Sequence, residues 1–198
     1  MNKIERRNKI LLLARDVFAK SGYHAAKIDD IVAAAGIARG TFYLYFEDKR
    51  AIFEEIVDRA FARLGAIIVR VDTDDPSRPV VDQVVENIGR VVHVLLEDPS
   101  TTKILLSDAV GLDPAFDKKL ISFYEGAAHL LESSLEDGQA RGIVAKGNAR
   151  MFALMTLGAI KEIMYQVVMR GLEVTEEQIV NEIYGFLCAG YLRTPRSD

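Results

Sequence analysis

The sequence predicts an all-α fold of about nine helices. Apolar residues recur at helical spacing along most of the 198-residue chain, and no stretch keeps the alternation of a strand between two turn signals. The prolines stand at plausible helix starts or beyond the last helix, at positions 76, 79, 99, 114 and 195. The predicted helices lie near residues 4–21, 28–35, 39–46, 49–71, 77–97, 100–110, 115–141, 148–170 and 175–193.

The composition is that of an ordinary soluble globular protein, with 49% apolar and 27% charged residues. The longest apolar run, from Met151 to Ile160, is too short to span a membrane, and no stretch has the pattern of a signal peptide. The single cysteine, Cys188, excludes a disulfide framework within the chain. We therefore expect a cytoplasmic protein.

Charge is divided unevenly along the chain. Residues 1–50 hold ten basic and six acidic side chains, a net charge of +4, whereas the remainder holds 15 basic and 23 acidic side chains, a net charge of −8. A basic end on an acidic body suits a phosphate-binding module joined to a carrier that does not itself contact nucleic acid. Charge alone does not separate this reading from chance unevenness.

The segment 27–49, KIDDIVAAAGIARGTFYLYFEDK, has the pattern of two short helices joined by a tight turn. Gly36 ends the first helix where an inter-helix turn is needed, and Ile37 follows it as an apolar residue that can pack between the helices. Phe42 and Phe46 are four residues apart and face inward together on the second helix. This spacing fits either a helix-turn-helix or an ordinary helical hairpin.

The side chains left on the outside of the second helix suit contacts with a DNA duplex. Arg39 can donate two hydrogen bonds to guanine, and Thr41 can contact a base edge or a thymine methyl group. Gly40 has no side chain and lets the backbone approach closely. Phosphate oxygens can be bonded by the hydroxyls and the ammonium of Tyr43, Tyr45 and Lys49.

Residues 8–53 resemble the N-terminal domain of the TetR family of transcriptional repressors. The matching elements, at fixed spacings, are Ile10, Ala14, Phe18-x3-Gly22-Tyr23, Ile28-x2-Ile31, Ala35-Gly36-Ile37, Gly40-Thr41-Phe42-Tyr43-x-Tyr45-Phe46 and Lys49-x3-Phe53. The resemblance implies a three-helix, helix-turn-helix domain that reads the major groove of double-stranded DNA. The predicted DNA-binding residues are Lys27, Ala38, Arg39, Gly40, Thr41, Tyr43, Leu44, Tyr45 and Lys49.

The sequence departs from the family pattern at two positions. Lys27 stands where the family usually has a threonine that caps the second helix, so a phosphate contact there would be made by a point charge instead of a hydroxyl. Val32 stands where a small alanine is usual, which can shift the angle between the two helices slightly.

The resemblance also implies a larger helical domain that binds an effector and dimerises. We expect the DNA-binding domain at residues 1–48 and the effector-binding and dimerisation domain at residues 49–198. The last two predicted helices are apolar on more than one face and must be covered on all sides. A second copy in a homodimer is expected to cover them, the alternative being the chain's own core. The predicted interface residues are Gly158, Ala159, Ile183, Phe186 and Ala189.

Aromatic and flexible apolar side chains of the second domain are candidates for an effector pocket. They are Phe61, Phe123, Tyr124, His129, Met151, Met155, Met164 and Tyr165, and for each of them ordinary core packing is the alternative. Two His–Glu pairs at i,i+4 spacing, His93 with Glu97 and Glu125 with His129, would bind a metal only if their helices faced each other. We predict no metal and no cofactor.

The sequence has no glycine-rich phosphate loop, no zinc signature and no nucleophile elbow. We therefore predict a regulator and not an enzyme: a homodimeric repressor that binds a palindromic operator and is released by a small, hydrophobic effector. Two alternatives stay open. One is a helical ligand carrier or enzyme with an incidental helix-turn-helix, and the other is a DNA-binding protein without an effector.

Overall fold

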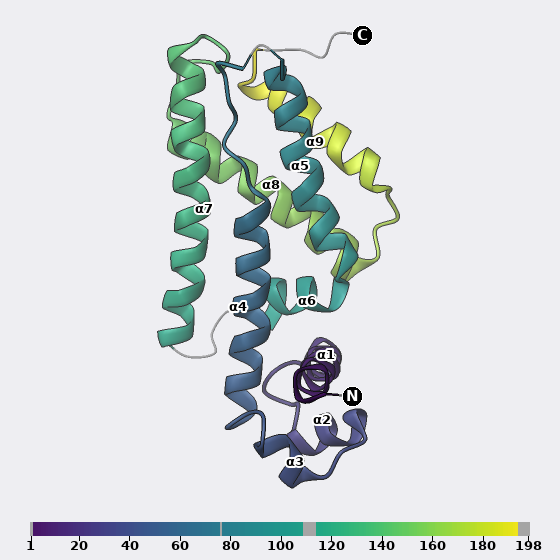
Figure 1. Cartoon of the computed structure of the whole chain (residues 1–198). Helices are drawn as coiled ribbons and strands as arrows, with labels where there is room; N and C mark the ends of the chain where they lie inside the picture. The colour runs from purple at the N-terminus through teal and green to yellow at the C-terminus, as the bar shows by residue number, and fades with distance from the viewer. Residues whose placement is uncertain (1, 76, 109–113, 194–198) are drawn as a thin grey trace. The chain divides into compact units, whose positions relative to one another are not determined.

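The computed structural model describes residues 2–75, 77–108 and 114–193 (Figure 1). Within these residues the regular elements are helices, with one isolated β-bridge between Val144 and Leu192. The helices confirm the predicted all-α fold. They are α1 (Lys3–Ser21), α2 (Ile28–Ala35), α3 (Arg39–Tyr43), α4 (Lys49–Ile67), α5 (Val80–Glu97), α6 (Pro99–Lys103), the π-helical turn η1 (Ile104–Asp108), α7 (Pro114–Ala140), α8 (Ala149–Arg170) and α9 (Glu176–Gly190).

Side-chain caps fix most of the helix starts. Asp48 accepts a hydrogen bond from the Ala51 amide at 2.7 Å, and Thr175 accepts one from the Gln178 amide at 3.1 Å. Asn148 caps α8 in the same way, at 3.0 Å from the Met151 amide. Each cap satisfies an amide that the helix itself leaves without a partner.

Four helices are shorter by three or more residues than the sequence predicted, those expected at 39–46, 49–71, 77–97 and 175–193. The expected helix 39–46 ends at Tyr43, and residues 44–46 continue as a turn. The expected helix 49–71 ends at Ile67, because the main chain of Val69 exchanges hydrogen bonds of 3.1 and 2.7 Å with the Asn87 side chain on α5. Tertiary hydrogen bonds outweigh local helical preference at this point.

Contacts divide the chain into two compact units, residues 1–63 with 98–117, and residues 64–97 with 118–198. The segment 98–117, which contains α6 and η1, therefore joins the N-terminal helices. This division by contacts differs from the functional division at residue 48 that the sequence suggested, and the functional division stays a prediction.

The core of the first unit is aromatic. Phe18, Phe42 and Phe53 are fully buried, and the rings of Phe18 and Phe53 meet edge to face with their centroids 5.1 Å apart. Phe116 packs on Phe53 with centroids 5.7 Å apart, and Arg15 on α1 pairs with Asp98 at the start of α6 at 2.9 Å. These contacts attach the segment 98–117 to α1 and α4.

The second unit is built around α5, α8 and α9. Helix α5 packs along α9, and α8 contacts both of them (Figure 1). Residues 191–193 pair with residues 143–145 through two main-chain hydrogen bonds of 2.8 Å. The amide of Ala145 donates to the carbonyl of Tyr191, and the amide of Arg193 donates to the carbonyl of Ile143. At Gly138 on α7 a Cβ atom would lie 2.6 Å from Val144, so the turn after α7 needs glycine there for close packing.

Helix α8 is, by length and composition, the one described helix apolar enough to cross a membrane, and only 22% of its most apolar stretch is buried. The sequence predicted no run long enough to span a membrane, because the apolar run stops at Ile160. Its centre carries the adjacent charges Lys161 and Glu162, and an apolar helix of a soluble assembly has the same composition. The exposed apolar side chains of α8 are expected to be buried against another element or a partner.

Candidate nucleic-acid interface

A tight turn joins α2 to α3. Gly36 adopts the left-handed conformation with φ 63° and ψ 39°, which glycine enters without steric cost. The amide of Ile37 then donates to the carbonyl of Val32 at 3.1 Å, which closes the C-terminal end of α2. The chain can therefore reverse within the three residues that precede α3, as a helix-turn-helix requires.

Helix α3 has one buried face and one open face. Phe42 is 0% exposed and Phe46 4%, whereas Tyr43 is 47% and Leu44 74% exposed. Arg39, Gly40 and the preceding Ala38 are also exposed, and Thr41 and Tyr45 are half-buried. The two faces are those that the spacing of the phenylalanines predicted.

Gly40 occupies a position that the fold itself does not require to be glycine. A Cβ atom built there would meet no atom within 4 Å, although glycine weakens a helix interior by about 1 kcal/mol relative to alanine. The absence of a side chain instead keeps the open face of α3 flat. Without a side chain at Gly40, the backbone at the start of α3 can approach a DNA duplex closely.

Arg39, the first residue of α3, reaches back to α2. Its Nη1 donates to Oδ1 of Asp29 at 2.7 Å, and both side chains are more than half exposed. A hydrogen bond to Tyr43 and the negative charge of Asp29 raise the pKa of Arg39, which stays fully protonated. The guanidinium is therefore held at the surface beside the open face of α3.

Lys49 lies differently from its predicted role as a phosphate contact. Its ammonium donates to the carbonyls of Tyr23 at 2.6 Å, Ala26 at 2.9 Å and His24 at 3.5 Å, and it sits 4.3 Å from the centre of the Tyr23 ring. An ammonium has three donors, so these carbonyls occupy all of them. Partial burial lowers the pKa of Lys49. Its role is to fasten the loop between α1 and α2 to the start of α4.

Lys27 is exposed and precedes α2 in an extended conformation, with no side-chain cap. The carboxylate of Asp30 caps the helix from the inside instead, accepting from the Lys27 amide at 2.9 Å. The missing threonine is thus replaced in part, and the Lys27 ammonium remains a predicted phosphate contact.

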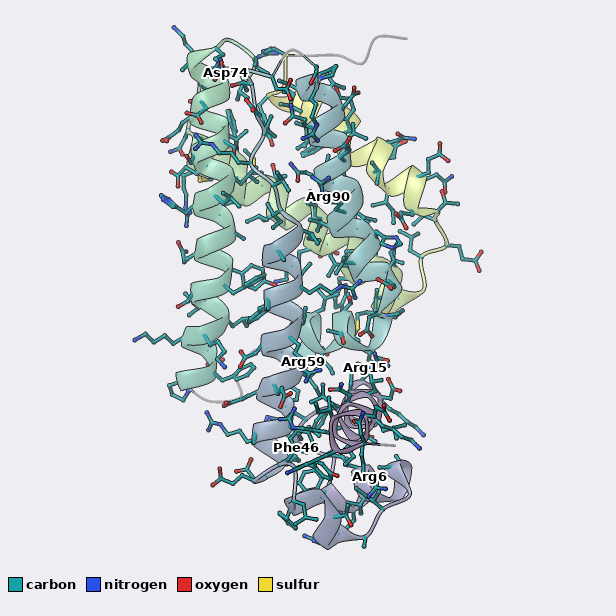
Figure 2. The ribbon with its side chains drawn as sticks, in the orientation of Figure 1. Arg6, Arg15, Phe46, Arg59, Asp74 and Arg90 are labelled. Atoms are coloured by element: carbon teal, nitrogen blue, oxygen red, sulfur yellow. The ribbon has the colours of Figure 1, made fainter. Side chains whose placement is uncertain are left out.

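Two basic residues of α1 border the same surface and are not among the predicted DNA-binding residues. Arg6 and Lys9 are exposed and line a hollow together with Gly36, Ile37 and Thr41 (Figure 2 labels Arg6). The one sequence feature that could have indicated a role for Arg6 and Lys9 in DNA binding was their place in the basic N-terminal segment. Only the packing of α1 against α2 brings them beside Thr41.

Comparison with known proteins identifies this arrangement. The model of the bacterial regulatory proteins of the tetR family matches residues 10–56, from α1 into α4. The HTH-type transcriptional regulator YdgC of Bacillus subtilis is 33% identical over 107 residues, which are 51% of this chain and 53% of that protein. The chain thus aligns with about half the length of YdgC. The fatty acid metabolism regulator protein of Bacillus subtilis is 23% identical over 184 residues, 92% of this chain and 93% of that protein. Residues 10–56, from α1 into α4, are therefore similar to the bacterial regulatory proteins of the tetR family.

Solved structures share the whole fold. The FadR regulator of Bacillus subtilis in complex with stearoyl-CoA has a TM-score of 0.73 at 23% identity, covering 92% of this chain and 98% of that chain. AibR in complex with isovaleryl coenzyme A and operator DNA has a TM-score of 0.75 at 16% identity, covering 92% and 97%. At these identities the similarity concerns the fold, in which the TetR-type helix-turn-helix precedes a helical domain.

The residues predicted for the effector do not come together. An apolar cavity lies in the second unit, but none of the eight predicted residues lines it. Met164 is fully buried elsewhere, and Met151, Met155 and His129 are exposed. Phe123, Tyr124 and Tyr165 are half-buried, and Phe61 belongs to the first unit. The lining is made mainly of valine, leucine and isoleucine, and a role of the eight residues in effector binding stays a prediction.

The two His–Glu pairs are not assembled into a metal site. Nδ1 of His93 lies 3.2 Å from Glu176 on α9, and Glu125 pairs with Arg150 on α8. The side chain of His129 is 83% exposed, with Glu132 at 3.9 Å. In the described residues no three potential metal ligands form a group.

The predicted dimer residues fall into two sets. Gly158, Phe186 and Ala189 are exposed, Phe186 by 55%, and Ala159 is half-buried. Ile183 is only 1% exposed and belongs to the core of its own unit. Ile183 is therefore a core residue, which corrects its assignment to the interface.

Replacing Arg39 with alanine should cost about 1–3 kcal/mol of affinity for the preferred duplex and relax the preference at one base position in each half-site. The reason is the loss of a forked donor at the start of α3. Fluorescence anisotropy with duplexes that differ at single positions measures both effects. An equal loss on every sequence would show that Arg39 contacts phosphate and does not read a base.

Proposed function

We propose that this chain is a ligand-responsive transcriptional repressor that binds a palindromic operator as a homodimer in the cytoplasm, without catalysing a reaction. The observation that carries the proposal is the open face of α3, where Arg39, Gly40 and Tyr43 are exposed above the buried Phe42. Thr41, Tyr45 and Lys27 complete the proposed DNA-binding surface, together with Arg6 and Lys9 of α1.

A homodimer is supported by the apolar face that α8 and α9 leave uncovered. Met151, Leu154 and Met155 on α8 and Phe186 on α9 are between 43% and 55% exposed. Gly158 on the same face of α8 has no atom within 4 Å of the position of a Cβ, which leaves room for a close partner helix. A second copy would cover this face and place two α3 helices for successive major grooves, about 34–36 Å apart.

An effector is supported by the cavity of the second unit and by the ligands of the structural neighbours. FadR and AibR were solved with coenzyme A esters, of a long and of a short acyl chain. A ligand changes operator affinity only if it binds the free and the DNA-bound forms unequally. We therefore propose that the body formed by residues 49–198 carries effector binding and dimerisation, and that residues 1–48 carry DNA binding.

Replacing Phe186 with aspartate should convert the dimer into a monomer and lower operator affinity at least about 100-fold, because a single head keeps only one half-site. Ile121→Asp is the matched control, since Ile121 is 60% exposed and belongs to α7 and not to α8 or α9. Sedimentation velocity gives the oligomeric state and anisotropy the affinity for DNA from the chain's own upstream region. A Phe186→Asp protein that stays dimeric and binds normally would contradict the proposed interface.

A further inference from the structure

The second unit contains an apolar cavity of about 150 Å3 that is partly open to solvent. Its walls come from α5, α7, α8 and α9, with Ile88, Leu135, Leu157 and Leu187 among them, and from residues 68–73, which follow α4. All of these residues belong to one compact unit, so the cavity does not depend on the placement of the other unit.

The cavity offers no charge and few polar atoms to a ligand. None of the described residues that line it is charged. Thr156 bonds the hydroxyl of Tyr191 at 2.6 Å and the carbonyl of Phe152 at 2.8 Å, and the Asn87 amide is bonded to the main chain of Val69. A charge placed here would lose its water without gaining a partner. The chemistry therefore selects an uncharged, apolar group.

The wall formed by residues 68–73 is held in place, which fixes the volume. Gln83 is 3% exposed; it donates to the carbonyls of Asp72 and Arg78 at 2.7 Å and accepts from the Asp72 amide at 2.8 Å. Asp74, labelled in Figure 2, receives two hydrogen bonds from Arg141, of 2.6 and 2.8 Å. A ligand that widens the cavity on this side would have to break these bonds.

We propose that the effector of this regulator presents a compact, uncharged apolar group of about six carbons to this cavity, and that carbons beyond this number gain no further affinity from it. A cavity of this volume with apolar walls holds a molecule of the size of benzene. An isovaleryl group meets this limit and a stearoyl chain exceeds it. The inference rests on the proposed function, because it names the chemical class of the effector.

The direct test is a binding series on the full chain. Acyl thioesters of 2 to 18 carbons are titrated by calorimetry, each as the coenzyme A ester and as the neutral N-acetylcysteamine ester. Affinity should rise about fourfold per methylene up to about six carbons and then stop rising or fall. The two ester series distinguish the acyl group of a coenzyme A ester from that of a neutral molecule as the source. Affinity that keeps rising to 18 carbons, or no binding of any ester, would overturn the proposal.

A cavity variant adds a second criterion. Leu135→Ala enlarges the cavity and should shift the optimum to longer chains, whereas Leu120→Ala should leave it unchanged. Both leucines are on α7, 5% and 6% exposed, and only Leu135 lines the cavity. If Leu135→Ala does not fold, the dependence of affinity on acyl length in the wild-type protein still tests the proposal. Operator release separates the two claims: affinity that keeps rising to a long-chain ester that releases DNA would uphold the repressor and refute the size limit.

A second inference concerns Asp29, which lies on the first turn of α2 beside Arg39. The pair is exposed on both sides, so it adds little to stability. A carboxylate at this surface also opposes the phosphate backbone and lowers affinity for any duplex. We infer that Asp29 is a positioning residue, which orients the Arg39 fork toward a base and away from phosphate.

Asp29→Asn should therefore have two opposite effects. Affinity for unrelated duplex should rise, since a negative charge is removed, and discrimination at the base read by Arg39 should fall about tenfold. Asp30→Asn is the control: it removes the same charge one residue away but leaves the Asp29–Arg39 pair. If the two variants lose discrimination equally, or if neither does, Asp29 does not position Arg39.

Discussion

Arg7 joins three parts of the DNA-binding unit through one guanidinium. It lies on α1, stacks 4.7 Å from the centre of the Phe46 ring just beyond α3, and forms a two-pronged ion pair with Glu55 on α4. This hydrogen bond, with the charges of Arg7 and Arg59, lowers the pKa of Glu55 despite its partial burial, so the carboxylate is ionised at neutral pH. The planar guanidinium can stack on the Phe46 ring and pair with the Glu55 carboxylate at the same time, whereas the ammonium of a lysine could not make both contacts.

The open face of α3 depends on these contacts of Arg7, because α3 is not stable as an isolated helix. A helix of five residues is far below the length at which an isolated helix is stable in water. Phe42 and Phe46 hold it down, Arg7 covers Phe46, and Lys49 fixes the loop that precedes α2. The side chains of the open face are thus free to serve recognition, while the residues between them carry the packing.

The sequence was a good guide where the signal is local. Helix starts at Asp48 and Thr175, the turn at Gly36 and the two faces of α3 follow from caps, a left-handed glycine and i,i+4 spacing. The sequence is a poorer guide where contacts between distant segments decide the position of a side chain. Lys49 has the place of a phosphate contact in sequence, but its three donors are used by carbonyls more than twenty residues away. The cavity lining, the burial of Ile183 and the place of Arg6 beside the turn likewise arise from packing between elements and have no local pattern.

The central claim is that two copies of this surface read one palindromic site. Selection of bound duplexes from a random library by the full-length protein tests it most directly. The account predicts enrichment of an inverted repeat whose half-site centres are about one helical turn, or a multiple of it, apart. Enrichment of a single half-site, or of no sequence at all, would contradict it.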